Sequence, residues 1–178
     1  MGIPYYDKEL LSRISEESGF SKEMMEEAEM KAKNSFFYSL SSAFGTGDSG
    51  PDSLSLNERF FLAQFDTIRK IADEGSCVIV GRCADYVLRG IPGATNIFIY
   101  AEKGDKIKRA VEEYNVPEKD VKKVMNDTDK ARANYYNYHT GRKWGDPVNY
   151  NLGIDSGYIS IDNIVKLIKD YLELKNER

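Results

Sequence analysis

The sequence is poor in the residues that form disulfides and hold metals. It has two cysteines and one histidine among 178 residues. Cys77 and Cys83 lie six residues apart, on either side of an apolar run, and are poorly placed to form a disulfide. Their spacing matches no metal site, and His139 is remote from them in sequence. We therefore predict reduced thiols, a cytoplasmic protein and no metal site.

Long apolar runs and basic runs are also lacking. No window approaches the ~18 apolar residues that a membrane-spanning helix needs. Charged residues occur among residues 1–9, before a signal peptide could form its apolar segment. The net charge is -4, and no Lys and Arg cluster forms the basic stripe of a duplex-binding protein. We predict neither a membrane nor a nucleic-acid partner.

The composition is otherwise that of an ordinary globular protein rich in tyrosine. Apolar residues make up 41% and charged residues 30% of a chain long enough for one domain with a sizeable core. Tyrosine occurs 12 times. Because a buried phenol needs a hydrogen-bond partner, some tyrosines are expected to line a polar cleft, although ordinary amphipathic packing accounts for the larger share.

Short apolar strands alternate with amphipathic helices along the chain. Strands are predicted at residues 3–6, 77–80, 96–101 and 150–155. This alternation is typical of an α/β protein with a mostly parallel sheet flanked by helices. The strand at 77–80 is apolar throughout, so we expect it to be covered on both faces.

Capping residues and glycines mark the ends of the predicted helices. N-caps are predicted at Asp7, Asp105 and Ser160. A long helix is expected to start at Pro117 and to end at Gly141. The helix that ends at Gly75 is expected to bury a stripe of four residues, namely Phe61, Phe65, Ile68 and Ala72.

Residues 41–54 are the least regular stretch of the sequence. They contain Gly45, Gly47, Gly50 and Pro51, which interrupt any helical or strand pattern. We predict a flexible surface loop here, with a functional lid as the alternative.

The strand at 77–80 leads directly into a glycine and an arginine. Ligands of open α/β sheets bind at the carboxyl ends of the strands. Gly81 would let the backbone approach a ligand, and Arg82 offers a planar fork to a phosphate or carboxylate. The alternative is a structural ion pair between Arg82 and Asp85.

The predicted long helix carries a second group of polar side chains. Asp129, Arg132 and Tyr136 share one side of that helix, so a carboxylate, a guanidinium and a phenol project together. A carboxylate beside an arginine holds the guanidinium in one orientation. A solvated ion pair is the alternative interpretation.

Two further segments could contact an anion. Arg142, Lys143 and Trp144 stand in a short glycine-containing loop that could close over an anionic, aromatic ligand. The alternative is a helix end with cations at the negative end of its dipole. Lys8 lies in the first turn of a helix, beside free backbone N–H groups that can receive phosphate. His139 is a weak catalytic candidate, since no nucleophile pattern accompanies it.

Six segments occur in an order that covers essentially the whole chain: 2–10, 78–85, 96–101, 132–138, 140–146 and 150–156. Together they resemble the cytidylate-kinase-like family of P-loop nucleoside-monophosphate kinases. The resemblance implies a three-layer parallel sheet flanked by helices. It also implies phosphoryl transfer from ATP, with Mg, to a nucleoside monophosphate or a similar small acceptor.

The resemblance also assigns roles to residues. Arg82 would hold the acceptor phosphate and Arg132 would neutralise the transferring group, the two catalytic assignments. Residues 127–147 would form a lid-like segment. The lid residues would be Asp129, Arg142 and Lys143, and the substrate-binding residues Lys8, Arg13, Arg82 and Asp85.

The chain departs from the family pattern in two places. Cytidylate kinases proper carry Asp-Gly-Arg-Asp where this chain has Val80 to Cys83, which leaves the acceptor base open. The resemblance also implies a strand and a phosphate-binding loop before residue 2, and no G-x-x-x-x-G-K-[ST] occurs in the sequence. Without this loop the chain alone is expected to be inactive, and a catalytically inactive nucleotide- or phosphate-binding or interaction module is the alternative.

We accordingly expect a single truncated kinase-like domain over residues 1–178, without its central first strand. That strand would lie between those at 77–80 and 96–101. Its loss would expose two sheet edges, so we expect either direct closure of the gap or pairing with a second chain in a homodimer. A natural start roughly 25 residues earlier, the length of a βα unit, is the alternative.

Overall fold

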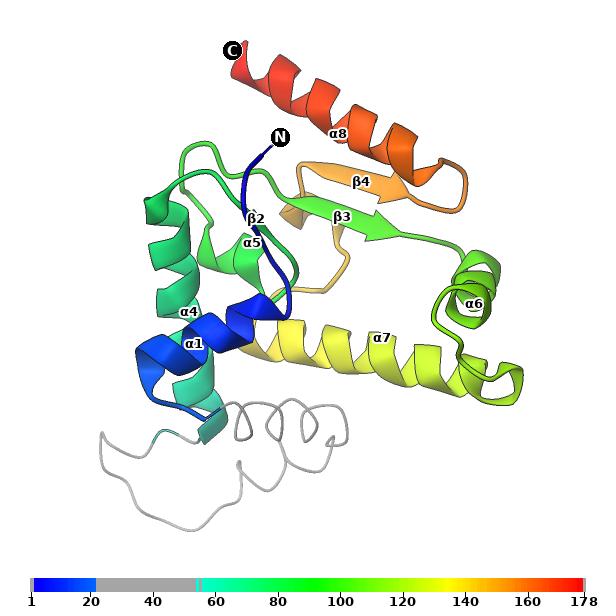
Figure 1. Ribbon diagram of the computed structural model, residues 1–178, viewed down its shortest axis with the longest axis horizontal. Coiled ribbons are helices and arrows are strands. Elements are labelled where there is room, and N and C mark those ends of the chain that lie inside the picture. Colours follow the sequence, from blue (N-terminus) through cyan, green and yellow to red (C-terminus); the bar gives the residue numbers. More distant parts are fainter. Residues whose placement is uncertain (1, 22–53, 55, 178) are drawn as a thin grey trace. The chain divides into compact units, whose positions relative to one another are not determined.

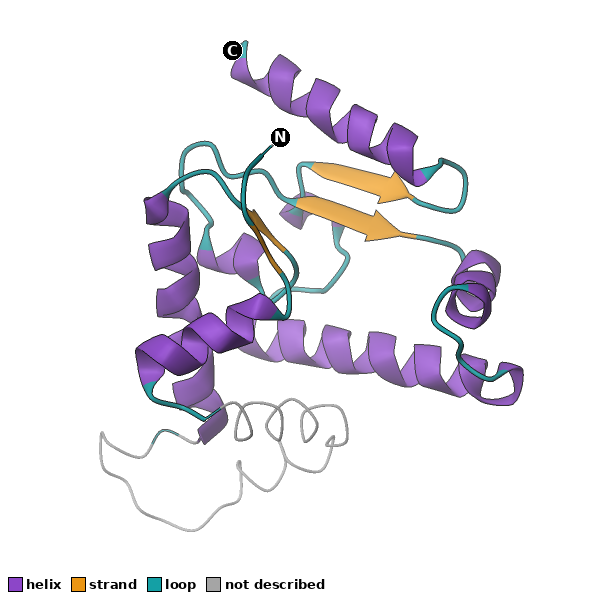
Figure 2. Cartoon of the chain, in the orientation of Figure 1, coloured by secondary structure: helices purple, strands orange, loops and turns teal. Residues whose placement is uncertain are grey.

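The computed structural model describes residues 2–21, 54 and 56–177 (Figure 1). The loop predicted at 41–54 lies outside this part except for Leu54, and stays a prediction. The described residues form short parallel strands and helices (Figure 2), as the α/β interpretation predicts. They divide into two compact units. Unit 1 comprises the described residues within 1–91 and 131–142, and unit 2 those within 92–130 and 143–178.

Unit 1 contains a two-stranded parallel sheet of β1 (Tyr5–Tyr6) and β2 (Val78–Ile79). The strands lie within the ranges predicted for them. The Val80 amide donates to the Tyr6 carbonyl at 2.8 Å, so the ladder reaches just past both strands. Because the strands are parallel, their carboxyl ends meet at one edge of the sheet. We call this the carboxyl edge of the β1–β2 sheet.

The second strand is less covered than the sequence predicts. Val78 is 46% and Val80 is 50% exposed among the described residues. Their apolar character predicted burial on both faces, but β2 pairs with β1 alone in a sheet of two strands. The expectation of full cover for this strand was therefore wrong for the described part of the chain.

Three helices pack on one another in unit 1: α1 (Glu9–Ser18), α4 (Leu56–Glu74) and α5 (Ala84–Val87). Leu10 and Ile14 lie one helical turn apart and are fully buried. The buried core of the unit consists of Leu10, Ile14, Phe60, Ile68, Ile71, Ala84 and Val87. α1 ends at Gly19, whose φ of 73° is the left-handed conformation typical of a helix C-terminus.

Unit 2 contains a second parallel pair, β3 (Ile97–Tyr100) and β4 (Leu152–Asp155). It also contains α6 (Lys103–Glu112), the 3-10 turn η1 (Pro147–Asn149) and α8 (Ile161–Asn176). The Ser160 hydroxyl accepts from the amide of Asn163, which confirms the predicted N-cap of α8. α7 (Glu118–Thr140) supplies residues to both units and ends before Gly141, as predicted.

Two of the three predicted N-caps are wrong. α1 begins after Lys8, and no side chain caps it, so Asp7 is not its N-cap. α6 begins after Glu102, which has extended backbone, and Asp105 lies inside the first turn. In both helices an acidic residue near the start interacts favourably with the positive N-terminal end of the helix dipole, but its side chain does not accept the N-cap hydrogen bond.

The strands β2 and β3 belong to two different two-stranded sheets. β2 belongs to unit 1 and β3 to unit 2, so direct closure of the expected gap stays a prediction. The missing central strand and the homodimer stay predictions. Among the described helices, none is both long and apolar enough to cross a membrane.

Candidate functional site

The candidate site starts at the carboxyl edge of the β1–β2 sheet, where β2 runs into a left-handed turn. Gly81, Arg82 and Cys83 have φ angles of 70°, 58° and 56°. Residues other than glycine adopt this left-handed backbone conformation at a cost of about 1–3 kcal/mol each. The turn closes through the Ala84 amide, which donates to the Gly81 carbonyl at 3.0 Å. Two adjacent strained residues at a strand end are a feature typical of ligand sites.

A buried glutamine connects this turn to α7. The Nε2 of Gln64, on α4, donates to the Arg82 carbonyl at 3.0 Å and to the Tyr135 hydroxyl at 3.1 Å. Gln64 is fully buried. Burial raises the pKa of the Tyr135 phenol, so the hydroxyl stays protonated at neutral pH. One amide group thus joins three elements of unit 1.

A second hydrogen bond connects the same segments. The Tyr136 hydroxyl donates to the Asp85 carboxylate at 2.6 Å, and Tyr136 is buried. Tyr135 and Tyr136 follow Arg132 by three and four residues, so all three lie on adjacent turns of one side of α7. The structure therefore brings the Arg82 turn to the part of α7 that carries Arg132, whose side chain is exposed. Tyr136 points inward rather than projecting with the arginine into solvent.

The Arg82 guanidinium is a partly desolvated cation. Burial lowers its pKa, while the negative charge of Asp7 acts in the opposite direction. The side chain remains charged, since an arginine does not deprotonate in proteins. Asp7 and Lys8 follow β1, so both lie at the carboxyl edge, and the Asp7 carboxylate is near enough to act on the charge of Arg82. Lys8 is exposed there.

Arg142, the predicted lid cation that belongs to unit 1, lies beside an aromatic ring. The Arg142 guanidinium is 5.4 Å from the centre of the Tyr86 ring, and the Arg89 guanidinium is 4.0 Å from it. Both distances are in the range of cation–π contacts. The Arg142 amide donates to the Thr140 hydroxyl at 3.0 Å, which fixes the backbone where α7 ends.

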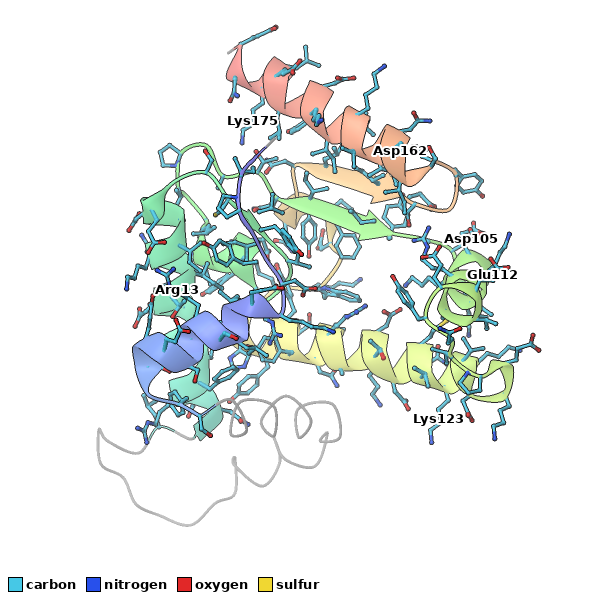
Figure 3. All side chains as sticks on the ribbon, viewed as in Figure 1. Arg13, Asp105, Glu112, Lys123, Asp162 and Lys175 are labelled. Carbon is cyan, nitrogen blue, oxygen red and sulfur yellow. The ribbon has the colours of Figure 1, made fainter. Side chains whose placement is uncertain are left out.

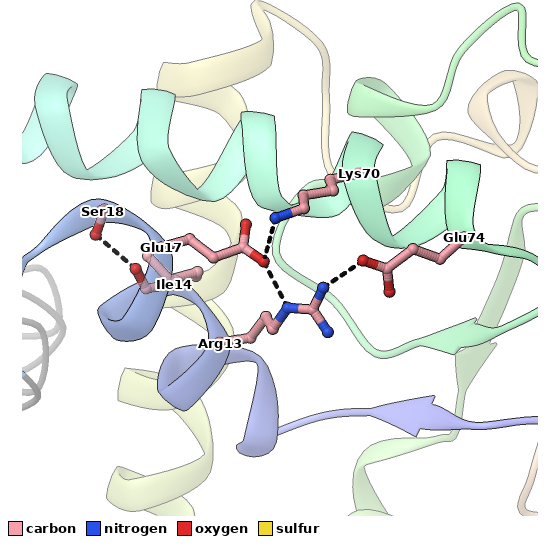
Figure 4. A network of polar contacts seen from close by, with 6 residues as sticks. All are labelled: Arg13, Ile14, Glu17, Ser18, Lys70 and Glu74. Atoms are coloured by element: carbon pink, nitrogen blue, oxygen red, sulfur yellow. Dashed lines mark hydrogen bonds and ion pairs between the residues drawn. The ribbon is translucent and has the colours of Figure 1, made fainter.

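Arg13, predicted as a second phosphate ligand, lies in an ion-pair network between α1 and α4 (Figure 3). Its Nε donates to Glu17 at 2.5 Å, and its Nη2 pairs with Glu74. Lys70 completes the network through Glu17 (Figure 4). Glu17 and Glu74 together raise the pKa of Arg13. A phosphate would have to compete with two carboxylates for this guanidinium.

The two other predicted lid residues belong to unit 2. Asp129 accepts a hydrogen bond from Lys106 at 2.7 Å, an ion pair between α7 and α6. Lys143 is exposed, and its carbonyl accepts from the Asn149 side chain at 3.2 Å. Neither contact joins these residues to the Arg82 turn, which belongs to unit 1.

His139 is part of an aromatic cluster. Its ring stacks on Phe61 at 4.1 Å and lies 4.5 Å from the Tyr135 ring. Burial lowers its pKa to about 4, although the nearby Glu58 acts in the opposite direction. A neutral, stacked imidazole fits a packing role, in keeping with its weakness as a catalytic candidate.

The described residues contain no group of three or more His, Cys, Asp and Glu side chains that could hold a metal ion. We therefore assign no metal ligand in this part of the chain. At the end of the parallel sheet the described site offers one partly desolvated guanidinium, that of Arg82, and a guanidinium can pair with an anion. Gln64 and Tyr135 were not predicted as site residues, because a single glutamine in an apolar helix stripe carries no motif. The one feature of the sequence that could have identified Gln64 is its place on the apolar side of the helix, where a polar side chain is unusual.

Short parallel sheets flanked by helices are consistent with an α/β protein of the kinase-like class. The model of the cytidylate kinase-like family matches residues 1–158, and the chain belongs to this family. The family prediction is thereby confirmed.

The chain is also similar to solved structures, one of which can be named. It is the crystal structure of an uncharacterized protein from Eubacterium ventriosum ATCC 27560, which is 35% identical. The match has a TM-score of 0.62 and covers 68% of this chain and 77% of that one. None of the curated proteins matches the chain.

Proposed function

We propose that the chain binds a nucleoside monophosphate, or a similar small phosphate acceptor, for phosphoryl transfer from ATP. Arg82 would hold the acceptor phosphate, and Arg132 would neutralise charge on the group in transfer. The observation that carries this proposal is the link from the Arg82 turn through Gln64 to Tyr135, one helical turn from Arg132. Membership in the cytidylate kinase-like family supports the reaction class.

The proposed reaction needs no protein nucleophile. An oxygen of the acceptor phosphate attacks the γ-phosphorus of ATP, a new P–O bond forms, and the bond to the β,γ-bridging oxygen breaks. The electron pair leaves with ADP. Such a transfer depends on positioning and on neutralisation of negative charge, which arginines supply. Family membership suggests Mg as the companion ion of ATP, and we assign no residue of this chain to it.

A second candidate function is nucleotide or phosphate binding without catalysis. It is favoured by one observation, the lack of any G-x-x-x-x-G-K-[ST] among the 178 residues. The backbone N–H groups of such a loop cradle the phosphates of the donor. Arginines on a strand end and a helix do not reproduce that geometry.

Two measurements on the 178-residue chain separate these candidates. The first is ADP formation from ATP in the presence of each nucleoside monophosphate. The second is calorimetric titration with ATP, with each nucleoside monophosphate and with inorganic phosphate. Phosphoryl transfer predicts ADP formation that depends on the acceptor. Binding without catalysis predicts heat on addition of a monophosphate and no ADP. Absence of binding to any nucleotide or to inorganic phosphate contradicts both.

A further inference from the structure

Gln64 is a polar residue in the buried core of unit 1. Its side chain is fully buried on α4, three residues from Thr67 and four from Ile68 and Phe60. Its Nε2 has two acceptors, the Arg82 carbonyl at 3.0 Å and the Tyr135 hydroxyl at 3.1 Å. A backbone carbonyl can only accept, so the amide nitrogen must face Arg82, which fixes the orientation of the side chain.

This orientation leaves the other end of the amide without a partner. Gln64 Oε1 is buried and has no hydrogen-bond partner among the described residues. A buried acceptor left unpaired lowers the stability of the folded state. An apolar side chain of similar length would avoid this cost. The glutamine therefore costs stability at this position unless its two donated bonds hold something in place.

What those bonds hold is the strained turn. Arg82 and Cys83 have φ angles of 58° and 56°, which side chains rarely adopt. The bond from Gln64 reaches the carbonyl of the first of these two residues. The bond to Tyr135 ties the same amide to α7. The amide is a two-pronged donor that fixes the backbone of Arg82 relative to α7.

We propose that Gln64 is a positioning residue: with Tyr135, it orients the backbone of Arg82 so that the guanidinium meets the phosphate of a nucleoside monophosphate. This inference rests on the proposed function, since it takes Arg82 as the phosphate ligand. Gln64 itself is enclosed by protein and does not touch the substrate. Its effect on binding passes through Arg82.

The first test is a double-mutant cycle of Gln64→Met and Arg82→Ala, read by calorimetric titration with cytidine monophosphate and with inorganic phosphate. Methionine keeps the length and removes the donor. We expect the Kd of Gln64→Met to rise roughly ten- to a hundred-fold, as misplacement of a binding group does. In the Arg82→Ala background the same change should have no further effect. Thr67→Val, which removes a buried hydroxyl from the same helix, should leave the Kd unchanged.

The second test measures the turn itself, through Cys83. This thiol is 5% exposed, and burial raises its pKa to about 12, so it should react slowly in the native protein. In a Cys77→Ser background Cys83 is the one remaining thiol, so the labelling rate with a thiol reagent, measured under conditions where each variant stays folded, reports the exposure of Cys83. We expect Gln64→Met and the milder Tyr135→Phe to increase that rate, and Thr67→Val to leave it unchanged.

The two tests separate the inference from the proposed function. An unchanged labelling rate in both Gln64→Met and Tyr135→Phe overturns the positioning role, as does a Gln64→Met effect on the Kd that persists in the Arg82→Ala background. Equal affinity of Arg82→Ala and the wild type contradicts the proposed function instead. Should Gln64→Met not fold, Tyr135→Phe carries both measurements.

Discussion

Arg82 and Cys83 combine two costs at the scale of single residues. Both adopt a left-handed backbone conformation, and burial disfavours both the Arg82 cation and ionisation of the Cys83 thiol. Hydrogen bonds from Gln64 and the packing of Cys83 offset part of this cost. A partly desolvated guanidinium at a strand end would gain from an anionic ligand, because the negative charge of the ligand compensates for the water that burial removes from around the cation.

His139 gives a prediction at the same scale. Its pKa of about 4 lies below the ordinary value because burial disfavours the imidazolium. Between pH 6.5 and about 4 the unfolded chain binds a proton that the folded chain does not, so the folded state loses stability as the pH falls through this window.

The chain has one histidine, so its ring resonance can be followed alone by proton NMR. We expect no titration near pH 6.5 in the folded protein. His139→Phe should reduce the loss of stability between pH 6.5 and 5, measured by denaturant unfolding. An imidazole pKa near 6.5 would contradict the buried, stacked arrangement with Phe61.

At the scale of elements, α1 and α4 are joined by their apolar faces and by the ion pairs of Arg13. Leu10 and Ile14 supply the buried face of α1, and Arg13 lies beside them on the outer side of the contact. The same arginine was predicted to bind phosphate. A role in ion pairs and a role in phosphate binding predict different effects of removing Arg13 on the affinity for a nucleotide.

Arg13→Ala should lower the denaturant midpoint slightly and leave affinity for cytidine monophosphate unchanged, because Glu17 and Glu74 occupy the guanidinium. Exposed ion pairs contribute little to stability. Arg69→Ala, at an exposed arginine of α4, is the matched control for loss of one positive charge. A loss of affinity specific to Arg13→Ala would instead favour its role as a phosphate ligand.

The N-cap of α8 gives a second prediction for an element. The Ser160 hydroxyl accepts from the Asn163 amide, one of the unpaired donors of the first turn. Ser160→Ala should destabilise the protein by about 1 kcal/mol. Thermal unfolding measures the change, and Ser160→Asp, which keeps an acceptor, should stay close to the wild type. An alanine variant as stable as the wild type would show that the cap contributes nothing.

The elements show how far sequence reasoning reached and where it stopped. Apolar runs predicted all four strands, and Pro117 and Gly141 predicted both ends of α7. The predicted buried stripe of α4 was wrong except at Ile68: Phe61, Phe65 and Ala72 are only half-buried. The buried face includes Gln64 and Thr67, which interrupt its apolar pattern. The spacing of polar side chains carries no information about a partner 71 residues away, such as Tyr135.

The sequence suggested the cations of the candidate site, but it did not suggest the residues that hold the Arg82 turn in place, Gln64 and Tyr135. Arg82 follows an apolar strand and a glycine, a local pattern that is legible in sequence. The left-handed conformation of Arg82 and Cys83 has no such signal, since neither is glycine. The Asp7 cap was wrong because a capping residue is recognised by type, while the helix start depends on the path of the chain out of β1.

At the scale of the whole molecule, the described residues form two compact units, each with its own parallel strand pair. Lys8, Arg82, Asp85, Arg132 and Arg142 fall in unit 1, and Asp129 and Lys143 in unit 2. The grouping of most predicted site residues in one unit supports a phosphate site there. The lid-like segment 127–147 takes residues from both units, and its role stays a prediction.

The central claim is that the Arg82 turn, held at the carboxyl edge of the β1–β2 sheet, binds the phosphate of a nucleotide. Its most direct test is calorimetric titration of the wild type and Arg82→Ala with cytidine, uridine, adenosine and guanosine monophosphates. We predict that at least one binds the wild type and that Arg82→Ala weakens it roughly ten- to a hundred-fold, the worth of a hydrogen bond to a charged group. Wild-type affinity in the correctly folded Arg82→Ala variant would contradict the claim.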